Sequence, residues 1–174
     1  GSIVLIFMIL SGGAMNNTDK KNRHVLLFIR ICLLSLAISL FFSCTPFKAE
    51  IPDIFAFSES RGKLEIYSPD GLKITVRAEK NTPQKEGEFW AGALENQLKK
   101  KGYLLEKQEC FSSTNLSGIS LLWVVPFGHE YYNYMTSLAV KGRKIYIMEA
   151  AGEQKLFKRY EKEIAGILSS LAAK

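Results

Sequence analysis

The feature that most constrains this chain is the apolar run between Val25 and Cys44, which a basic segment (residues 20–24) precedes. The part of the run that no charge interrupts, residues 31–42, is well short of the roughly 20 residues that a membrane-spanning helix needs. A basic segment, a short apolar segment and a small residue at the end are typical of a secretory signal peptide. The run therefore predicts a leader that is removed, rather than part of the fold.

The end of the run, Leu-Phe-Phe-Ser-Cys at residues 40–44, resembles a bacterial lipobox. In that motif a small residue precedes a cysteine, which receives diacylglycerol on its sulfur and becomes the acylated N-terminus after cleavage. The resemblance implies that Cys44 is a lipidation site, carrying acyl chains such as palmitate. It also implies a membrane-anchored lipoprotein of the cell envelope that faces the periplasm or the cell exterior.

Two other interpretations of the run stay open. A signal-anchor helix from Val25 to Phe42 would place Arg30 inside the bilayer, where an arginine costs roughly 2.5 to 3.5 kcal/mol. A buried core helix would need a polar face at helical spacing, which the run lacks, and Thr45 and Pro46 follow the run at once. We favour the removed leader over both.

This interpretation divides the chain into four segments. Residues 1–14 precede a natural start at Met15, as a cloning remnant or an upstream segment, and residues 15–43 form the lipoprotein signal peptide. Residues 44–62, rich in polar residues and prolines, form a lipidated tether, and residues 63–174 form a single α+β domain. The apolar residues at positions 54, 55 and 57 leave open an edge strand within the tether.

Charge and cysteine content exclude two classes of protein. The net charge of +6 comes in large part from four basic residues of the leader, so the remainder carries ordinary solubility charge and is not predicted to bind nucleic acid. Cys32 lies in the leader and Cys44 would be acylated, which leaves Cys110 without a disulfide partner. We expect Cys110 to be a small buried or half-buried apolar residue.

The first strong structural signal after the leader is a hairpin. Apolar residues alternate on both sides of the turn Ser-Pro-Asp-Gly at residues 68–71, from Leu64 to Val76. Thr82 and Pro83 then predict the start of a helix that ends at Gly102. Its predicted apolar face comprises Phe89, Trp90, Ala93, Leu94 and Leu98.

Four strand-like segments follow, at residues 103–110, 119–127, 130–140 and 143–149, and a helix closes the chain. The strand from Ile119 is apolar on both faces, which predicts a central strand covered on both sides. The closing helix begins near Glu153 and carries one apolar stripe, with Arg159 and Glu163 spaced to pair. The order of hairpin, helix, β-meander and helix predicts an α+β fold, in which helices flank an antiparallel β-sheet.

The element order and two short motifs resemble the PsbP-like superfamily. The motifs are the turn at residues 67–71 and the segment at residues 138–152 that leads into the last helix. The superfamily includes extrinsic photosystem II subunits, a Ran-binding nuclear import factor and bacterial lipoproteins. The resemblance implies a PsbP-like sandwich and a binding or assembly protein rather than an enzyme, and it transfers no functional residue.

The sequence shows no constellation of residues that predicts catalysis, a metal site or a cofactor. His129 is the only histidine after the leader, and no group of ligands at metal-binding spacing accompanies it. Carboxylate pairs would have to form across strands, for which Glu149 is one candidate. The candidate binding surface is aromatic, although alternation puts Tyr132 and Tyr134 on one face of a strand and Tyr131 on the other. Its members are Trp123, Tyr131, Tyr132, Tyr134 and Tyr146.

These observations predict a non-enzymatic lipoprotein that binds or scaffolds an envelope component, held at the membrane through Cys44 and monomeric. The expected partners are the membrane and an envelope protein. The alternative is a carrier of a small apolar ligand in a pocket between sheet and helix. An enclosed apolar cavity would favour the carrier, and a filled core with an exposed apolar patch would favour the scaffold.

Overall fold

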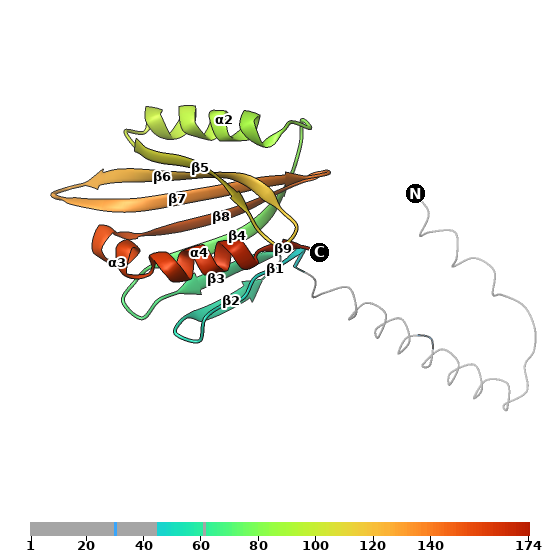
Figure 1. Ribbon diagram of the computed structural model, residues 1–174, viewed down its shortest axis with the longest axis horizontal. Coiled ribbons are helices and arrows are strands. Elements are labelled where there is room, and N and C mark those ends of the chain that lie inside the picture. The colour runs from blue at the N-terminus through green and yellow to red at the C-terminus, as the bar shows by residue number, and fades with distance from the viewer. Residues whose placement is uncertain (1–29, 31–44, 61) are drawn as a thin grey trace, which may run out of the picture. The chain divides into compact units, whose positions relative to one another are not determined.

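The computed structural model describes Arg30, residues 45–60 and residues 62–174 (Figure 1). Apart from Arg30, the predicted leader lies outside the described residues, and so do the first fourteen residues and Cys44. The strands are β1 (Phe47–Lys48), β2 (Ala56–Ser60), β3 (Lys63–Tyr67), β4 (Lys73–Lys80), β5 (Leu104–Ser112), β6 (Ser117–Phe127), β7 (Glu130–Lys141), β8 (Lys144–Glu153) and β9 (Ala172–Ala173). The helices are α2 (Gly87–Lys100), α3 (Gln154–Arg159) and α4 (Glu161–Ser170).

A seven-stranded antiparallel sheet in the order β2-β3-β4-β8-β7-β6-β5 forms the middle layer. Helix α2 covers one face of the sheet, and α3 and α4 cover the other, as Figure 1 shows. We call these faces the α2 side and the α4 side. Strands β1 and β9 form a separate two-stranded sheet. The predicted α+β fold, an antiparallel sheet flanked by helices, is confirmed.

The predicted hairpin is β3 and β4, joined by the turn at residues 68–72. The Ser68 hydroxyl accepts a hydrogen bond from the Leu72 N–H at 2.8 Å and donates one to Asp70 at 2.7 Å. Gly71 has φ +104°, a left-handed conformation that glycine adopts without strain. Turn chemistry and alternation agree in this hairpin, so both are recognisable from sequence.

Helix α2 begins at Gly87 rather than at Thr82, so the predicted start was wrong. The side chain of Asn81 explains the delay. Its carbonyl oxygen accepts hydrogen bonds from the Lys85 N–H at 3.1 Å and the Trp90 indole at 2.8 Å, and its amide donates to the Lys85 carbonyl at 3.0 Å. These bonds satisfy the polar groups of the segment before the helix without helical geometry.

The buried face of α2 also differs from the predicted one. Ala91 and Leu98 are buried, whereas Phe89 is 50% exposed. Phe89 instead packs edge-on against Trp90, with ring centroids 5.3 Å apart. The helix ends where predicted, because Gly102 at φ +85° follows the last turn.

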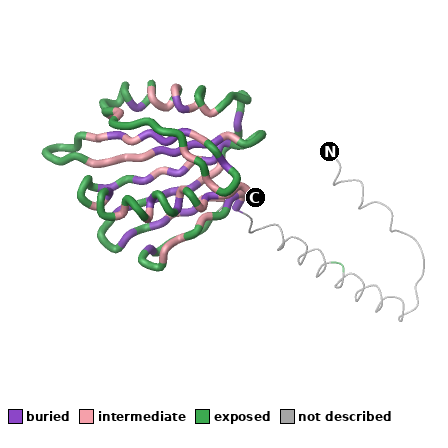
Figure 2. Tube along the Cα trace, viewed as in Figure 1, coloured by how far each residue is buried: buried purple, intermediate pink, exposed green. Residues whose placement is uncertain are grey.

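The meander of β5 to β8 has the predicted order, with a tight turn at Gly142 (φ +60°) between β7 and β8. Two expectations about it were wrong. Cys110 is exposed, because β5 is an edge strand that α2 covers only near its start. Strand β6 lies next to that edge, so its α2 side is buried while Leu122 and Val124 on its α4 side are only half-buried. Figure 2 shows buried and half-buried positions alternating along the middle strands of the sheet.

The closing helix is broken at Tyr160 into α3 and α4. Tyr160 packs against Phe55, with ring centroids 5.4 Å apart. Arg159 pairs with Asp70 at 2.5 Å, so the predicted pair with Glu163 does not form. The predicted apolar stripe is nevertheless buried at Phe157, Ile164, Ile167 and Leu171.

The segment predicted as a tether belongs to the fold over its described residues. Phe47 and Phe55 are buried in the α4-side core, and β2 is the edge strand beside β3. The Lys174 N–H also donates to the Pro46 carbonyl at 2.9 Å, which joins the two ends of this unit. Phe47 and Phe55 hold this segment on the domain, because their burial removes apolar surface from water. The domain boundary therefore lies before Phe47, not at residue 63.

Candidate functional site

The sheet separates the aromatic residues that form the candidate binding surface. Trp123 is fully buried on the α2 side and Tyr134 is half-buried there, 5.9 Å from the ring of Tyr103. Tyr146 is buried on the opposite side, in the α4-side core. Tyr131 and Tyr132 lie near the turn between β6 and β7. These residues therefore contribute to separate parts of the molecule.

The end of the β6–β7 hairpin carries three aromatic residues, Phe127, Tyr131 and Tyr132, which we call the aromatic hairpin end. By strand alternation Phe127 and Tyr132 lie on one face of the sheet and Tyr131 on the other. Phe127 is 74% exposed and Tyr131 is 57% exposed. Phe127 packs edge-on against Tyr132, with ring centroids 6.0 Å apart. Partial burial raises the pKa of Tyr132, and the nearby carboxylates of Glu130 and Glu153 add to the effect. The aromatic hairpin end therefore exposes a large ring on each face, and exposed rings of this size mark a surface available for contact.

The aromatic hairpin end lies at the opposite end of the strands from residue 45. Strand β6 runs from the turn at residues 113–116 to Phe127, and its eleven residues span about 35 Å. At the first of these ends, the Asn115 side chain bonds to the Ala173 carbonyl at 2.9 Å and to its N–H at 2.8 Å. Strand β9 in turn pairs with β1 beside residue 45.

A pocket of about 200 Å³ lies between α2 and strands β4, β7 and β8. We call it the α2-side pocket. Its walls are largely apolar, and its polar lining groups come from both the sheet and the helix. The apolar lining comprises Trp90, Ala93, Leu94, Leu138, Ile145 and Ile147, and the polar lining comprises Arg77, Gln97, Thr136 and Glu149.

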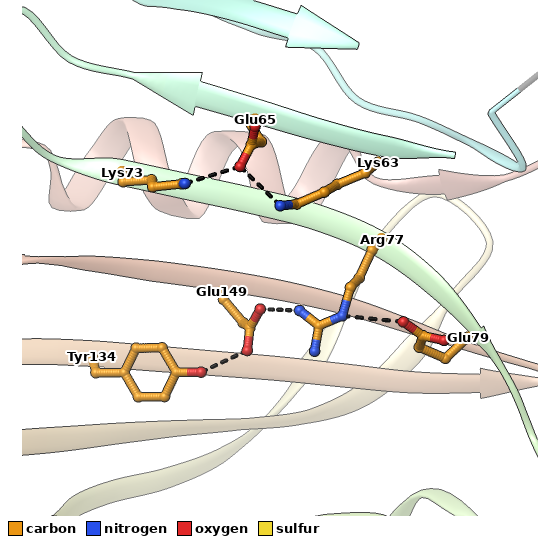
Figure 3. Close-up of polar contacts among 7 residues, drawn as sticks. All are labelled: Lys63, Glu65, Lys73, Arg77, Glu79, Tyr134 and Glu149. Atoms are coloured by element: carbon orange, nitrogen blue, oxygen red, sulfur yellow. Dashed lines mark hydrogen bonds and ion pairs between the residues drawn. The ribbon is translucent and has the colours of Figure 1, made fainter. Parts of the chain in front are cut away.

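Arg77, Glu149 and Tyr134 form a connected polar cluster at the pocket (Figure 3). Glu149 pairs with the Arg77 guanidinium and accepts a hydrogen bond from the Tyr134 hydroxyl at 2.6 Å. Arg77 also contacts Glu79 at 3.4 Å. Burial and the hydrogen bond to Glu149 raise the pKa of Tyr134 well above its usual range, so the phenol holds its proton.

Thr136 also lines the pocket. It is only 2% exposed, and its hydroxyl lies beside the Tyr134 hydroxyl, where it partly offsets the rise in the pKa of Tyr134. The buried indole N–H of Trp123, on the same side of the sheet, has no hydrogen-bond partner within the described residues.

Beyond the pocket, charged residues cross the part of the α2 side that the helix leaves open. Glu65 on β3 lies between Lys63 at 2.8 Å and Lys73 at 2.9 Å, as Figure 3 shows. Hydrogen bonds from these two lysines lower the pKa of Glu65 to about 2. We call Lys63, Glu65 and Lys73 the outer ion pairs.

The α4 side has a hollow of its own, between strands β5 to β7 and helices α3 and α4, with a volume of about 200 Å³. We call it the α4-side groove. It forms because α4 lies over the other half of the sheet and leaves Leu122 and Met135 half-buried. Its apolar lining includes Phe111, Leu122, Met135, Phe157, Ile164 and Leu168, and Lys107, Glu109 and Glu161 are its charged residues.

The described residues bring together no set of groups for covalent or metal chemistry. Within them, no three His, Cys, Asp or Glu side chains gather as metal ligands would. His129 and Cys110 are both exposed and lie on different strands or turns. Among the described helices, none has the length and apolar character needed to span a bilayer.

Sequence reasoning missed Arg77 and Thr136 and could not place Glu149. The available signal was weak, because Arg77 alternates with buried Val76 as any polar residue on a half-covered strand would. Pairing of β4 with β8 and of β8 with β7 is what brings these residues together. Strand order, rather than a local motif, creates this cluster.

Comparison with known proteins defines the fold class. No protein-family model matches the chain, and no curated protein sequence matches it. LpqN, involved in cell envelope biogenesis of Mycobacterium tuberculosis, has a crystal structure that matches with a TM-score of 0.54 at 8% identity, over 72% of this chain and 82% of LpqN. The solution structure of cyanobacterial PsbP (CyanoP) from Synechocystis matches with a TM-score of 0.50 at 8% identity, over 76% of this chain and 95% of CyanoP.

A crystal structure from Bacteroides thetaiotaomicron also matches, with a TM-score of 0.51 at 15% identity over 77% of this chain. The match covers only 47% of that longer chain. At such identities the likeness defines the fold alone. The protein is thus an α+β protein with a helix-flanked antiparallel sheet, and more specifically it has a PsbP-like fold.

Proposed function

We propose that this protein is a non-enzymatic envelope lipoprotein, attached to a membrane through Cys44, whose aromatic hairpin end binds a protein partner in the envelope. One observation carries the proposal: Phe127 and Tyr131 are exposed at the end of the sheet opposite to residue 45. Attachment next to residue 45 would direct the aromatic hairpin end away from the membrane. The domain would then present this end to neighbouring proteins.

The composition of the aromatic hairpin end suits a protein interface. Tyrosine and phenylalanine are enriched in interface cores, where they bury a large area for little loss of conformational freedom. Polar groups of His129 and Glu130 lie within the same turn and would form a rim. The exposed rings would lose contact with water on binding, which is the main source of affinity at such sites.

The comparisons support an envelope role in a general way. LpqN is described as involved in cell envelope biogenesis, and it shares the fold. CyanoP shares the fold as well. Among the described residues, no group of side chains is arranged in a way that would argue for catalysis.

The test is site-specific photocrosslinking of the full-length protein in its native host. A photoreactive residue at Phe127 is expected to yield a discrete crosslinked species in the membrane fraction, and Tyr131→Ala is expected to reduce its yield about tenfold or more. The matched control is a photoreactive residue at Phe89, an exposed aromatic on α2, which should yield no such species. Cys44→Ser should prevent diacylglycerol attachment and the cleavage that follows it, so the leader should stay on the chain.

Each part of the proposal can fail separately. Equal crosslinking from positions 127 and 89, or a yield that Tyr131→Ala leaves unchanged, would contradict recognition by the aromatic hairpin end. A mature N-terminus at which Cys44 carries no acyl chain would contradict the lipid anchor. Mass spectrometry of the mature N-terminus reads the second result directly.

The α4-side groove favours a second candidate function, the transport of a small apolar ligand. Its lining is mainly apolar, and Leu122 and Met135 are only half-buried there. Decanol is a suitable probe, because its chain could lie along the groove. Saturable shifts of the Met135 methyl signal on titration would support a carrier, and a groove-filling Ala165→Phe substitution should abolish them. Shifts that persist in that variant would contradict it.

A further inference from the structure

We propose that one end of the sheet binds the headgroups of anionic phospholipids in the membrane to which the chain is attached. The binding groups are four cationic side chains that we call the basic end. The inference rests on the membrane attachment proposed above and adds a second contact with the bilayer. The basic end comprises Lys80, Lys141, Arg143 and Lys144.

Strand pairing aligns three lysines in one row across the sheet. Lys144 on β8 is the register partner of Lys80 on β4 and also of Lys141 on β7. Paired residues lie on the same face, and neighbouring strands are about 4.8 Å apart, so the row is about 10 Å wide. Like charges at paired positions repel one another and destabilise a sheet. The row therefore concentrates positive charge at a cost in stability, which a bound anionic surface would offset.

The charge of the basic end is not compensated within the described residues. Its four side chains are exposed and form no ion pair there. A hollow of about 580 Å³ lies between Lys80, Arg143 and Lys144, and none of the described residues that line it is acidic. Glu79, which precedes Lys80, alternates to the other face and contacts Arg77 at 3.4 Å. An approaching anion therefore meets free positive charge.

Asn81 fixes the backbone that carries these cations. Its N–H donates to the Arg143 carbonyl at 2.9 Å, and its side-chain amide donates to the Gly142 carbonyl at 3.4 Å. Asn81 is buried. The turn between β7 and β8 is thus joined to the end of β4. Because this backbone is already ordered, binding costs little conformational entropy beyond that of the side chains.

The basic end lies at the end of the sheet where β1 and β9 are found (Figure 1). Lys141 donates to the Asn115 carbonyl at 3.4 Å, and the Asn115 side chain bonds to the backbone of β9. Because β1 follows Cys44 closely in the chain, a lipid anchor there would bring the basic end to the headgroups. The turn at the opposite end, residues 127–132, carries Glu130 and no lysine or arginine.

A membrane surface suits the basic end better than a single soluble anion does. One phosphate group would contact only part of a row about 10 Å wide. A bilayer with anionic lipid presents many phosphates in one plane, so all four cations act together. Each Lys or Arg close to such a surface strengthens binding about fivefold. The contact would also hold the aromatic hairpin end away from the membrane.

The test is vesicle binding by the unit from Cys44 to Lys174 with Cys44→Ser, so that no lipid chain contributes. This unit contains both hydrophobic cores complete. The vesicles consist of phosphatidylcholine, alone or with about one third phosphatidylglycerol, and cosedimentation measures the partition. We expect the partition to be about a hundredfold higher on the anionic vesicles. About 1 M sodium chloride should remove most of this difference.

Two triple variants assign the surface. The first replaces the lysine row: Lys80→Gln, Lys141→Gln and Lys144→Gln. Its matched control removes the same net charge from exposed positions at the C-terminal end of α2: Lys99→Gln, Lys100→Gln and Lys101→Gln. The row variant should bind anionic vesicles about a hundredfold more weakly, with no fall in its urea midpoint, because a repulsion is removed. The control should lose less than about threefold.

A second measurement needs no substitution in the basic end. In bicelles of the anionic composition, a nitroxide on the lipid headgroup should broaden the amide signals of Gly142 and Arg143. It should leave the signal of Gly128, in the turn between β6 and β7, almost unchanged. Stronger broadening at Gly128 would place the membrane contact at the aromatic hairpin end and would overturn the proposal.

Three other results would also overturn it. One is equal partition onto both kinds of vesicle. Another is an equal loss in the row variant and its control, because net charge alone would then attract the unit. The third is displacement by inorganic phosphate beyond that by sodium chloride of the same ionic strength, which would make the basic end a site for a soluble anion. None of these results bears on acylation of Cys44 or on crosslinking at Phe127, so the function proposed above is tested separately.

Discussion

The two sides of the central sheet differ in residue composition. The α4 side is a continuous apolar core to which almost every strand contributes, and α3, α4 and residues 47–55 close it. On the α2 side the apolar core lies under the helix alone, and charged residues cover the remaining strands. The difference follows from the helices: α2 is a single helix that packs on β5 to β7, so much of β3 and β4 faces water on that side.

This difference suggests a division of roles. Burial of apolar area is the largest favourable term in folding, so the α4 side supplies most of the stability. The α2 side holds half-buried charges, which contribute less to stability than buried apolar area does. Groups of that kind are better suited to bind another molecule. The following predictions test this difference between the two sides at a buried, a half-buried and an exposed position.

The largest effect is expected from removal of the segment before Gly62. A chain that begins at Gly62 lacks Phe47 and Phe55, which are both buried in the α4-side core. Loss of two buried phenylalanines and of edge strand β2 should lower the free energy of unfolding by at least about 4 kcal/mol. Urea unfolding, with the chain from Cys44 as the reference, measures the difference.

A chain from Gly62 that unfolds as cooperatively and at the same urea concentration as the longer chain would contradict this assignment. Residues 45–60 would then add no stability to a core that α3 and α4 already cover. Double substitution of Phe47 and Phe55 by alanine in the longer chain separates the loss of the two rings from the loss of β2.

A medium effect is expected from Glu149→Gln on the α2 side. Glutamine can still accept the hydrogen bond from Tyr134, but it loses the charge that pairs with Arg77. We expect the free energy of unfolding to fall by about 1 to 2 kcal/mol. The pKa of Tyr134 should also fall towards its usual range, because the carboxylate charge of Glu149, which disfavours the phenolate, is removed.

Urea unfolding and absorbance titration of the tyrosines measure the two effects. Glu79→Gln is the control, since Glu79 is more exposed and touches Arg77 only at 3.4 Å. It should cost less than about 0.5 kcal/mol. Equal losses from the two substitutions would mean that the cluster of Arg77, Glu149 and Tyr134 is an ordinary surface ion pair.

The elements that sequence predicts well here are those with local causes. The hairpin at residues 68–72 combines turn residues with alternating apolar residues. Gly102 ends a helix and Gly142 lies in a tight turn, both with a positive φ that few residues other than glycine adopt. The start of α2 was predicted wrongly because the side chain of Asn81 holds the segment before the helix in a non-helical conformation. The break of the last helix at Tyr160 was not predicted, because Tyr160 packs against Phe55, which is far away in sequence.

The pocket and the exposed aromatic residues were less predictable, because they depend on which helix covers which part of the sheet. The aromatic residues could be assigned to faces of β7, but sequence could not show that α2 buries Trp123 while Phe127 and Tyr131 are exposed. The α2-side pocket requires the strand order β4-β8-β7, which joins residues far apart in the chain. Alternation records only that a face is polar, not which partner lies beside it.

The smallest effect is expected at the outer ion pairs, in acid. The pKa of Glu65 is lowered from 4.5 to about 2 by hydrogen bonds from Lys63 and Lys73, so the folded protein favours its ionised form. The stabilisation from this group is therefore complete above about pH 4.5 and is lost as the pH falls through about 2. Glu65→Gln should make the melting temperature less sensitive to pH in this window. Lys73→Ala, which removes one of two partners, should produce part of that change, and 1 M salt should reduce it in the unsubstituted protein. An unchanged acid profile in Glu65→Gln would mean that the outer ion pairs contribute nothing to stability, and that the charged part of the α2 side serves only to keep that face soluble.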